Sequence, residues 1–341
     1  MPDTKFGCLP TIIGTMPHTD PEAACSQILH YLKDIPAWPQ LPGRSYKENM
    51  NVQFSEGFPG AVARDNGILI DRSLDLQTPL EKLYRAYLGN DISQFPVSPD
   101  YAAGLHTFLT IPNLSPLAVK GQITGPVTWG LTVTDNDGRP IMYDDILGDA
   151  VPKFLRLKAA WQEQELRRIS PNTIIFVDEP YMASFGSVAM NLSKEKVVSL
   201  LDEVFGGVSG LKGVHCCGNT DWSVLLETSV DIVSFDAYNY AESLSLYSDD
   251  VKDFVSNAGA IAWGIVPNSE EALARESAAS LKDRLEEAMA PFTRDGIRFR
   301  ELLERGLLTP SCGLANMKEE TATRALELLA ELSEMIRKRY V

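Results

Sequence analysis

Long apolar runs and basic residues are both scarce in this sequence. None of the 341 residues belongs to an uninterrupted apolar stretch of about 18, which a membrane-spanning helix needs. The first ten residues, MPDTKFGCLP, also lack the charged-then-apolar pattern of a signal peptide, so we expect a cytoplasmic protein. Only 31 basic residues oppose 46 acidic ones, giving a net charge of −15. This balance disfavours nucleic acids and anionic membranes as partners, because their phosphates attract basic surfaces.

Cysteine is also rare, and its distribution argues against disulfides. The five cysteines are Cys8, Cys25, Cys216, Cys217 and Cys312, an odd number that is widely spaced. A chain of this length and 44% apolar composition can build a large core without disulfide bonds. We therefore expect free thiols, which remain available as metal ligands.

Short apolar runs followed by turn residues recur along the chain and alternate with helical patterns. The eight runs cover residues 9–14, 51–55, 117–123, 173–177, 211–217, 230–235, 260–266 and 307–311. Helical periodicity covers residues 21–32, 143–169, 194–205, 271–290 and 318–340. Eight alternating units predict an α/β fold, namely a single (β/α)8 TIM-type barrel domain over residues 1–341.

One long connection interrupts this alternation. A rim or lid insertion is expected after the second strand, over about residues 57–116, because this segment is rich in proline and glycine. Within it we expect a strand at residues 67–72 and helices at residues 80–88 and 99–110. A turn or hairpin tip is expected farther along, at residues 135–140.

Polar residues stand at nearly every expected strand end, where active sites of such barrels lie. In order they are Thr15, Glu56, Gln122 with Thr124, Asp178 with Glu179, His215 with Cys217, Asp236, Asn268 and Cys312. Alternate residues of a strand share a face, so His215 and Cys217 point the same way and Cys216 points to the other side. Nitrogen and sulfur ligands suit zinc, and the eighth strand can bring Cys312 across the mouth as a third ligand.

Several of these residues have more than one interpretation. Free cysteines often act as small buried hydrophobic residues. Asp236 could occupy the fourth zinc position or support His215 from behind. Only one of Asp178 and Glu179 can face the pocket, and either could instead cap a helix or lie in a loop.

The motifs resemble those of a known superfamily. HCCGN, the aspartate of SFDAYN, and TPSCGL are similar to the zinc site of the superfamily that unites cobalamin-independent methionine synthase, methylcobamide:thiol methyltransferases and uroporphyrinogen decarboxylase. TIIGTMPHTD, VKGQITGPVT and IIFVDEP resemble its first-, third- and fourth-strand motifs. The similarity extends over nearly the whole chain and is greatest to a core-type, single-barrel methionine synthase.

The resemblance implies a zinc-dependent S-methyltransferase with His215, Cys217, Cys312 and Asp236 as metal ligands. The superfamily usually has glutamate where Asp236 stands, so both direct and water-mediated contact with zinc remain open. The resemblance further implies that Glu56 and Asp178 bind the acceptor's ammonium group, and that Thr15 contacts it through its backbone. The acceptor would be a small-molecule thiol, with homocysteine giving methionine in methionine biosynthesis.

The methyl donor implied by the resemblance is a methylcobamide, such as methylcobalamin, carried by a corrinoid protein. The folate-dependent synthase has a second barrel and a histidine that helps protonate the departing folate, whereas this sequence has Asn268. Alternatives are methyl transfer to coenzyme M, decarboxylation of a porphyrinogen, and a zinc-binding partner protein without catalysis. The sequence lacks the arginine-rich amino-terminal signature that a porphyrinogen decarboxylase would use to bind carboxylates, because Arg44 is the first arginine.

Overall fold

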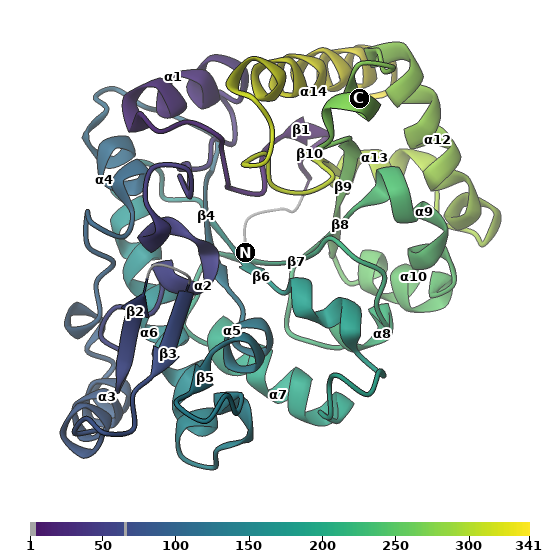
Figure 1. Ribbon diagram of the computed structural model, residues 1–341. Coiled ribbons are helices and arrows are strands. Elements are labelled where there is room, and N and C mark those ends of the chain that lie inside the picture. Colours follow the sequence, from purple (N-terminus) through teal and green to yellow (C-terminus); the bar gives the residue numbers. More distant parts are fainter. Residues whose placement is uncertain (1–4, 65–66) are drawn as a thin grey trace.

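A curved parallel sheet forms the centre of the protein (Figure 1). The computed structural model describes residues 5–64 and 67–341. Within these ranges the sheet has seven strands, and every neighbouring pair is parallel. Their order is β1 (Leu9–Pro10), β10 (Leu307–Pro310), β9 (Ala260–Val266), β8 (Ile232–Phe235), β7 (Leu211–Cys216), β6 (Thr173–Asp178) and β4 (Val119–Thr124). The expected mixed α/β class is confirmed, with one strand fewer than expected.

Helices cover the outside of this sheet (Figure 1). They include α1 (Pro21–Tyr31), α5 (Pro126–Thr132), α6 (Leu147–Leu166), α7 (Lys194–Phe205), α8 (Trp222–Leu226), α9 (Ala237–Ser245), α10 (Ser248–Ser256), α11 (Glu270–Leu273), α12 (Ala278–Arg294), α13 (Phe299–Arg305) and α14 (Glu319–Tyr340). The helices expected at residues 21–32, 194–205 and 318–340 are confirmed, and α6 begins four residues later than expected. None of the helices in the described ranges combines the length and hydropathy that crossing a bilayer requires.

The helix expected at residues 271–290 is two helices, α11 and α12. Ser277 begins α12 with a capping box, in which its hydroxyl accepts from Ser280 N and the Ser280 hydroxyl accepts from Ser277 N. A capping box satisfies two backbone N–H groups at a helix start, so it stabilises a new helix where continuous periodicity predicted one long helix.

The prediction of a strand at residues 51–55 is wrong, because this part of the chain forms the short helix α2 (Met50–Gln53). Asn49 caps the helix through its side chain, which accepts a hydrogen bond from Asn51 N. The apolar residues Val52 and Phe54 alternate as in a strand, but a run this short also fits one helical turn. The cap at Asn49 therefore favours the helix over the strand.

Residues 34–40 lie between β1 and β4, at the place expected of the second strand. Ala37 forms a parallel bridge with Lys120 of β4, and Gln40 forms one with Thr15 beyond β1. Lys120 N donates to Pro36 O at 2.9 Å. Prolines at positions 36 and 39 have no N–H to donate, which interrupts the regular pattern of a strand.

The two faces of the sheet bury different sets of side chains. One small cluster comprises Phe6, Leu9, Ile35, Ala118, Ile174, Phe176, Leu211, Ile232, Ala260, Ala262 and Leu307. These residues alternate along their strands with residues that pack into the larger cluster beneath the helices, such as Ile175, Val233 and Cys216. The small cluster therefore fills the concave side of the sheet. Ile35 belongs to it, which places residues 34–40 on the same wall.

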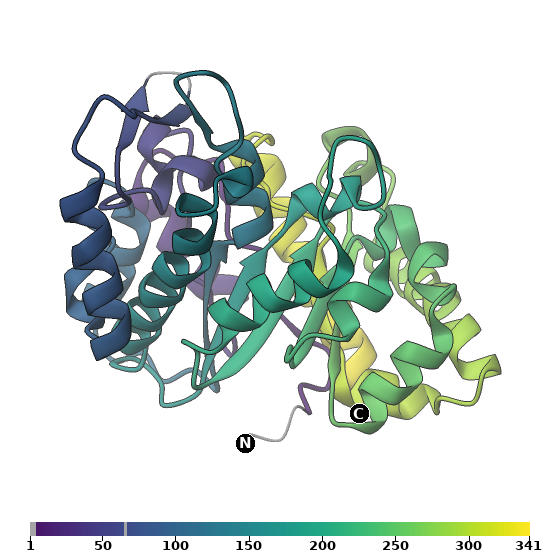
Figure 2. The same cartoon turned by 90° about the horizontal axis from the view of Figure 1, so that it is seen from below.

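The insertion contributes two of the three strands of a small sheet beside the central one. Strands β2 (Ala61–Arg64) and β3 (Gly67–Ile70) pair antiparallel, and β3 pairs with β5 (Thr134–Asp135). Figure 2 shows this hairpin at the upper edge of the molecule, on the flank that α3 (Gln77–Gly89) also covers. Together with α4 (Ala103–Thr110), these elements confirm the strand and both helices expected there, although α4 begins later than expected. Asp135 N donates to Arg139 O, which confirms the turn.

Candidate metal centre

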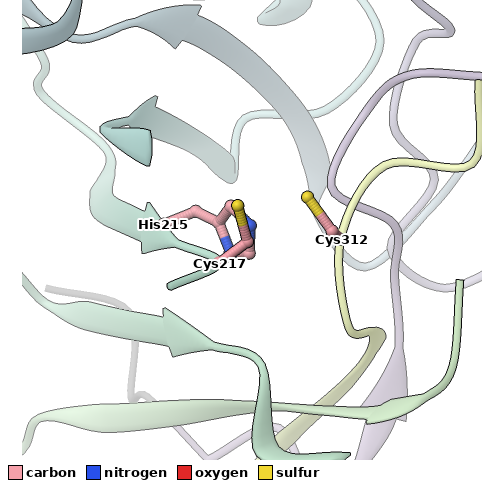
Figure 3. Close-up of side chains that lie close together, drawn as sticks. All are labelled: His215, Cys217 and Cys312. Atoms are coloured by element: carbon pink, nitrogen blue, oxygen red, sulfur yellow. The ribbon is translucent and has the colours of Figure 1, made fainter. Parts of the chain in front are cut away.

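Three potential metal ligands from distant parts of the chain converge at one end of the sheet. His215 lies in β7, Cys217 directly follows this strand, and Cys312 follows β10. The imidazole nitrogen and the two sulfur atoms all lie within 4.8 Å of one another. Figure 3 shows His215 and Cys217 on one side and Cys312 on the other, with the Cys312 thiol pointing toward them. His215 is buried and both cysteines are half-buried, so the group borders solvent on one side.

Glycines after both cysteines allow this convergence. A Cβ atom at Gly218 would lie 2.6 Å from the Cβ atom of Ala183, and one at Gly313 would overlap the Thr15 hydroxyl. Atoms without bonds between them do not approach this closely, so other residues at these positions would displace the chain. The loops that carry Cys217 and Cys312 therefore pack closely against Ala183 and Thr15 because glycine has no side chain.

The His215 ring is oriented by one hydrogen bond and leaves the other nitrogen free. Nδ1 lies 3.0 Å from the Ser234 hydroxyl of β8. Within the described part of the chain, the buried Nε2 atom has no hydrogen-bond partner. A buried polar atom without a partner is costly unless a ligand completes it. With two thiols beside it, this nitrogen forms a donor set that fits zinc.

Removing the Ser234 hydroxyl tests its role in orienting His215. We expect Ser234→Ala to weaken zinc binding by about tenfold, the low end of the effect of second partners of ligating histidines. Competition with a chromophoric chelator measures the affinity. Ser256→Ala, on the exposed surface of α10, should leave it unchanged. Equal affinities of Ser234→Ala and the unsubstituted protein would exclude an orienting role.

The two thiols influence each other's ionisation. The neighbouring Cys312 thiol, and after it the His215 ring, lower the pKa of Cys217, although burial opposes this change. The pKa of Cys312 is correspondingly raised, first by Cys217 and then by burial. The lowered pKa of Cys217 favours its thiolate form, and a thiolate is the form of cysteine that binds a metal cation.

Hydrogen bonds brace the loop that carries Cys312. The Ser311 hydroxyl donates to Asn268 Oδ1 at 3.0 Å and accepts from Asn268 N at 3.2 Å. Leu314 N donates to Thr15 O at 2.9 Å, so the segment that follows β1 lies beside the cysteine loop. Sequence reasoning missed Ser234 and Ser311 because a serine on an apolar strand carries no distinctive pattern.

Asp236 lies at the end of β8, near this group but outside the three residues within 4.8 Å. Its carboxylate caps α9, accepting from Asn239 N at 2.9 Å and from Asn239 Nδ2 at 2.7 Å. Burial raises the pKa of Asp236, and His215 and Cys217 are among the charged groups that act on it. Asp236 is thus held close to the centre while its oxygens bind the following helix.

Asp178 and Glu179 take different roles. Glu179 is fully buried and caps α5, accepting from Val127 N at 2.9 Å and Thr128 N at 2.7 Å. Asp178 pairs with His215 across neighbouring strands, and its buried Oδ1 atom has no hydrogen-bond partner among the described residues. Burial raises the pKa of Asp178, and the charge of Lys120 offsets part of the rise. Asp178 is therefore the carboxylate with an oxygen free for a ligand.

Glu56 and Thr15 differ in their surroundings, and only Thr15 lies beside the loop of a candidate metal ligand. Glu56 follows α2, is half-buried, and accepts a hydrogen bond from Ser98 N of the insertion at 2.9 Å. It does not belong to the three-residue group. Thr15 lies beside the Cys312 loop, as described above.

Comparisons with known proteins bear on the fold. The sequence matches no protein-family model and no curated protein. A solved structure from Listeria monocytogenes, assigned as a vitamin-B12-independent methionine synthase, is similar with a TM-score of 0.56 and 13% identity, covering 93% of this chain and 86% of that chain. A methyltransferase from Methanosarcina mazei is similar with a TM-score of 0.53 and 16% identity, covering 92% and 86%.

A third comparison is weaker. A B12-independent methionine synthase from a Shewanella species, in complex with selenomethionine, has a TM-score of 0.45 and 18% identity, and the similarity covers 65% of this chain and 62% of that chain. The first two comparisons extend over nearly the whole chain. The chain therefore shares the fold of these two structures, and the expected resemblance is confirmed at the level of the fold.

Proposed function

We propose that this protein is a zinc-dependent methyltransferase that transfers a methyl group from a methylcorrinoid to the thiol of homocysteine, forming methionine. The observation that carries this proposal is the convergence of His215, Cys217 and Cys312 at the end of the parallel sheet. The fold shared with a methyltransferase supports it. We further propose a single (β/α)8 barrel in which residues 34–40 act as the second strand.

The ligand set explains how a thiol could react near neutral pH. A free thiol has a pKa near 8.5 and is mostly protonated, whereas the nucleophile is the thiolate. His215, Cys217 and Cys312 would hold a zinc ion with one position open, and that ion would stabilise the acceptor sulfur as a thiolate. The two cysteine sulfurs would neutralise the dication, which would leave the acceptor sulfur electron-rich.

The acceptor would be oriented by the groups around this centre. Asp178 has a buried oxygen without a partner, suited to an ammonium group. Thr15 lies next to Cys312 and would contact the acceptor through its backbone, while Asp236 would support the zinc site directly or through water. Glu56 would contribute only if the acceptor reached the insertion. An ammonium held at Asp178 turns the sulfur toward the donor and reduces the entropy cost of reaction.

The donor is inferred from the absence of an acid at Asn268. Its amide accepts from Ser311 and donates to Gly313 O at 3.5 Å, and an amide cannot protonate a leaving group. With a methylcobamide, a sulfur–carbon bond forms as the carbon–cobalt bond breaks. The electron pair of the broken bond stays on cobalt, so the leaving group needs no proton. A corrinoid protein would deliver this donor.

Methyl transfer to a panel of thiols tests the proposal. We expect the zinc-loaded protein to demethylate methylcobalamin with homocysteine at least tenfold faster than with coenzyme M, because a sulfonate would be repelled by the Asp178 carboxylate. The absorbance of the cobalamin and the mass of the thioether report the reaction. A preference for coenzyme M would contradict the homocysteine assignment. Zinc binding without methylation of any thiol would instead indicate a zinc-binding partner protein.

A further inference from the structure

Only two of the five cysteines are partly exposed, and they are the two thiols of the candidate metal centre. All five are free thiols in this structure. Cys217 and Cys312 are half-buried, whereas Cys8, Cys25 and Cys216 are buried with at most 1% of their surface exposed. A dissolved oxidant reaches an exposed thiol more readily than a buried one. We therefore expect oxidation to begin at the metal centre.

The two exposed thiols are also close enough to react with each other. Their sulfur atoms lie within 4.8 Å, and the Cys312 thiol points toward Cys217 (Figure 3). A disulfide bond needs about 2.0 Å between the sulfur atoms, a separation that rotation of the two side chains about their Cα–Cβ bonds can approach. Cys216 does not compete for Cys312, because its side chain lies on the opposite face of β7, beneath the helices.

The loop that carries Cys312 is held in place by bonds that involve no metal ligand. The Ser311 hydroxyl donates to Asn268 Oδ1 at 3.0 Å, and Leu314 N donates to Thr15 O at 2.9 Å. These bonds do not depend on an ion in the centre. The two thiols should therefore stay side by side after a metal ion leaves.

We propose that Cys217 and Cys312 form a reversible disulfide bond when the protein meets a peroxide, and that this bond releases the zinc ion. Zinc binds the thiolate form of cysteine, so a sulfur atom in a disulfide is lost as a ligand and the two states exclude each other. The release of zinc rests on the proposed function, whereas the disulfide itself depends only on the positions of the two sulfur atoms.

The oxidation proceeds in two displacement steps. One thiolate attacks an oxygen of hydrogen peroxide, the O–O bond breaks, and a sulfenic acid and a hydroxide form. The second thiolate attacks the oxidised sulfur, the S–S bond forms, and the S–O bond breaks as a second hydroxide leaves. The two sulfurs together lose two electrons, which the peroxide gains, and two protons from water balance the hydroxides. A second thiol at this distance thus removes the sulfenic acid before it is oxidised irreversibly to sulfinic acid.

Titration of the zinc-loaded protein with hydrogen peroxide tests the proposal. We expect one zinc ion to be released for each disulfide formed, measured with a chromophoric chelator. Tryptic digestion without a reductant should yield the peptide of residues 213–252 joined to the peptide of residues 306–318, identified by mass spectrometry. Dithiothreitol should separate the two peptides and restore zinc binding.

Cys216→Ser is the matched control, because Cys216 and Cys217 lie in the same tryptic peptide. This variant should give the same joined peptides and release zinc equally, and Cys216→Ala serves the same purpose if the serine variant does not fold. Cys312→Ser tests the second thiol, with both proteins compared in the metal-free state. Its Cys217 should become a sulfinic acid that dithiothreitol does not reverse, whereas the unsubstituted protein should recover its thiols.

Three results would overturn the inference and leave the proposed function intact. They are a sulfinic acid in place of the joined peptides, a bond from Cys312 to Cys216, and a zinc-loaded protein that excess peroxide leaves unchanged. Zinc that stays bound after Cys217 and Cys312 are joined would overturn both the inference and the proposed ligand set. If the unsubstituted protein bound no zinc, the proposed function would fail and zinc release with it, while peptide mapping would still confirm or exclude the disulfide.

Discussion

Cys312→Ser is expected to reduce methyl transfer from methylcobalamin by well over 100-fold and to prevent stoichiometric zinc binding. Cys312 is the one of the three candidate ligands that follows β10, so without it only His215 and Cys217, at the end of β7, remain. Two ligands do not form a zinc site, and a hydroxyl is a far poorer ligand than a thiolate for this ion. The loss should exceed the 10- to 100-fold typical of residues that only support a ligand. Metal content after dialysis and the initial rate of methyl transfer measure the two effects.

Cys216→Ser is the matched control for this prediction. Cys216 is adjacent to Cys217, but its side chain is completely buried on the opposite face of β7, among the residues beneath the helices. Zinc content and the rate of methyl transfer should therefore remain near those of the unsubstituted protein, whereas the free energy of unfolding should fall because a hydroxyl replaces a core thiol. Retention of one equivalent of tightly bound zinc by Cys312→Ser would refute the proposed centre.

Asp178→Asn is expected to raise the KM for homocysteine by roughly 100-fold. The substitution keeps the shape of the side chain and removes the charge that would pair with the acceptor's ammonium group. Hydrogen bonds between charged groups in a buried site contribute about 1.5 to 3 kcal/mol, which corresponds to roughly one to two orders of magnitude in affinity. Steady-state kinetics at saturating methylcobalamin measure KM and kcat separately.

An acceptor without the ammonium group is the control for Asp178. The compound 4-mercaptobutanoate matches homocysteine in every other respect, and we expect Asp178→Asn to change its KM by less than about threefold. A similar increase for both thiols would show that the substitution damages the site generally. A normal KM for homocysteine in Asp178→Asn would instead exclude contact between Asp178 and the ammonium group.

The order of strands and helices could be predicted from the sequence wherever local pattern and environment agreed. Strands β6, β7 and β9 are buried on both faces and appear as continuous apolar runs bounded by turns. The prediction failed at residues 34–40 and 51–55, where the local pattern misleads. Residues 34–40 contain two prolines and do not look like a strand, yet they pair with the segments on both sides. Residues 51–55 alternate like a strand, yet they lie in and next to the capped helical turn α2. Neither outcome depends on the segment's own pattern alone.

The residue types and the alternation along β7 by themselves determined that His215 and Cys217 share a face and that Cys216 faces the other way, because side chains of a strand alternate. Only the tertiary structure brought Cys312 within 4.8 Å of them, because that distance depends on the curvature of the whole sheet. The tertiary structure also determined which of Asp178 and Glu179 caps a helix and which keeps a free carboxylate oxygen. The amino end of α5 presents two N–H groups that only Glu179 reaches, which leaves the Asp178 carboxylate beside the candidate metal centre.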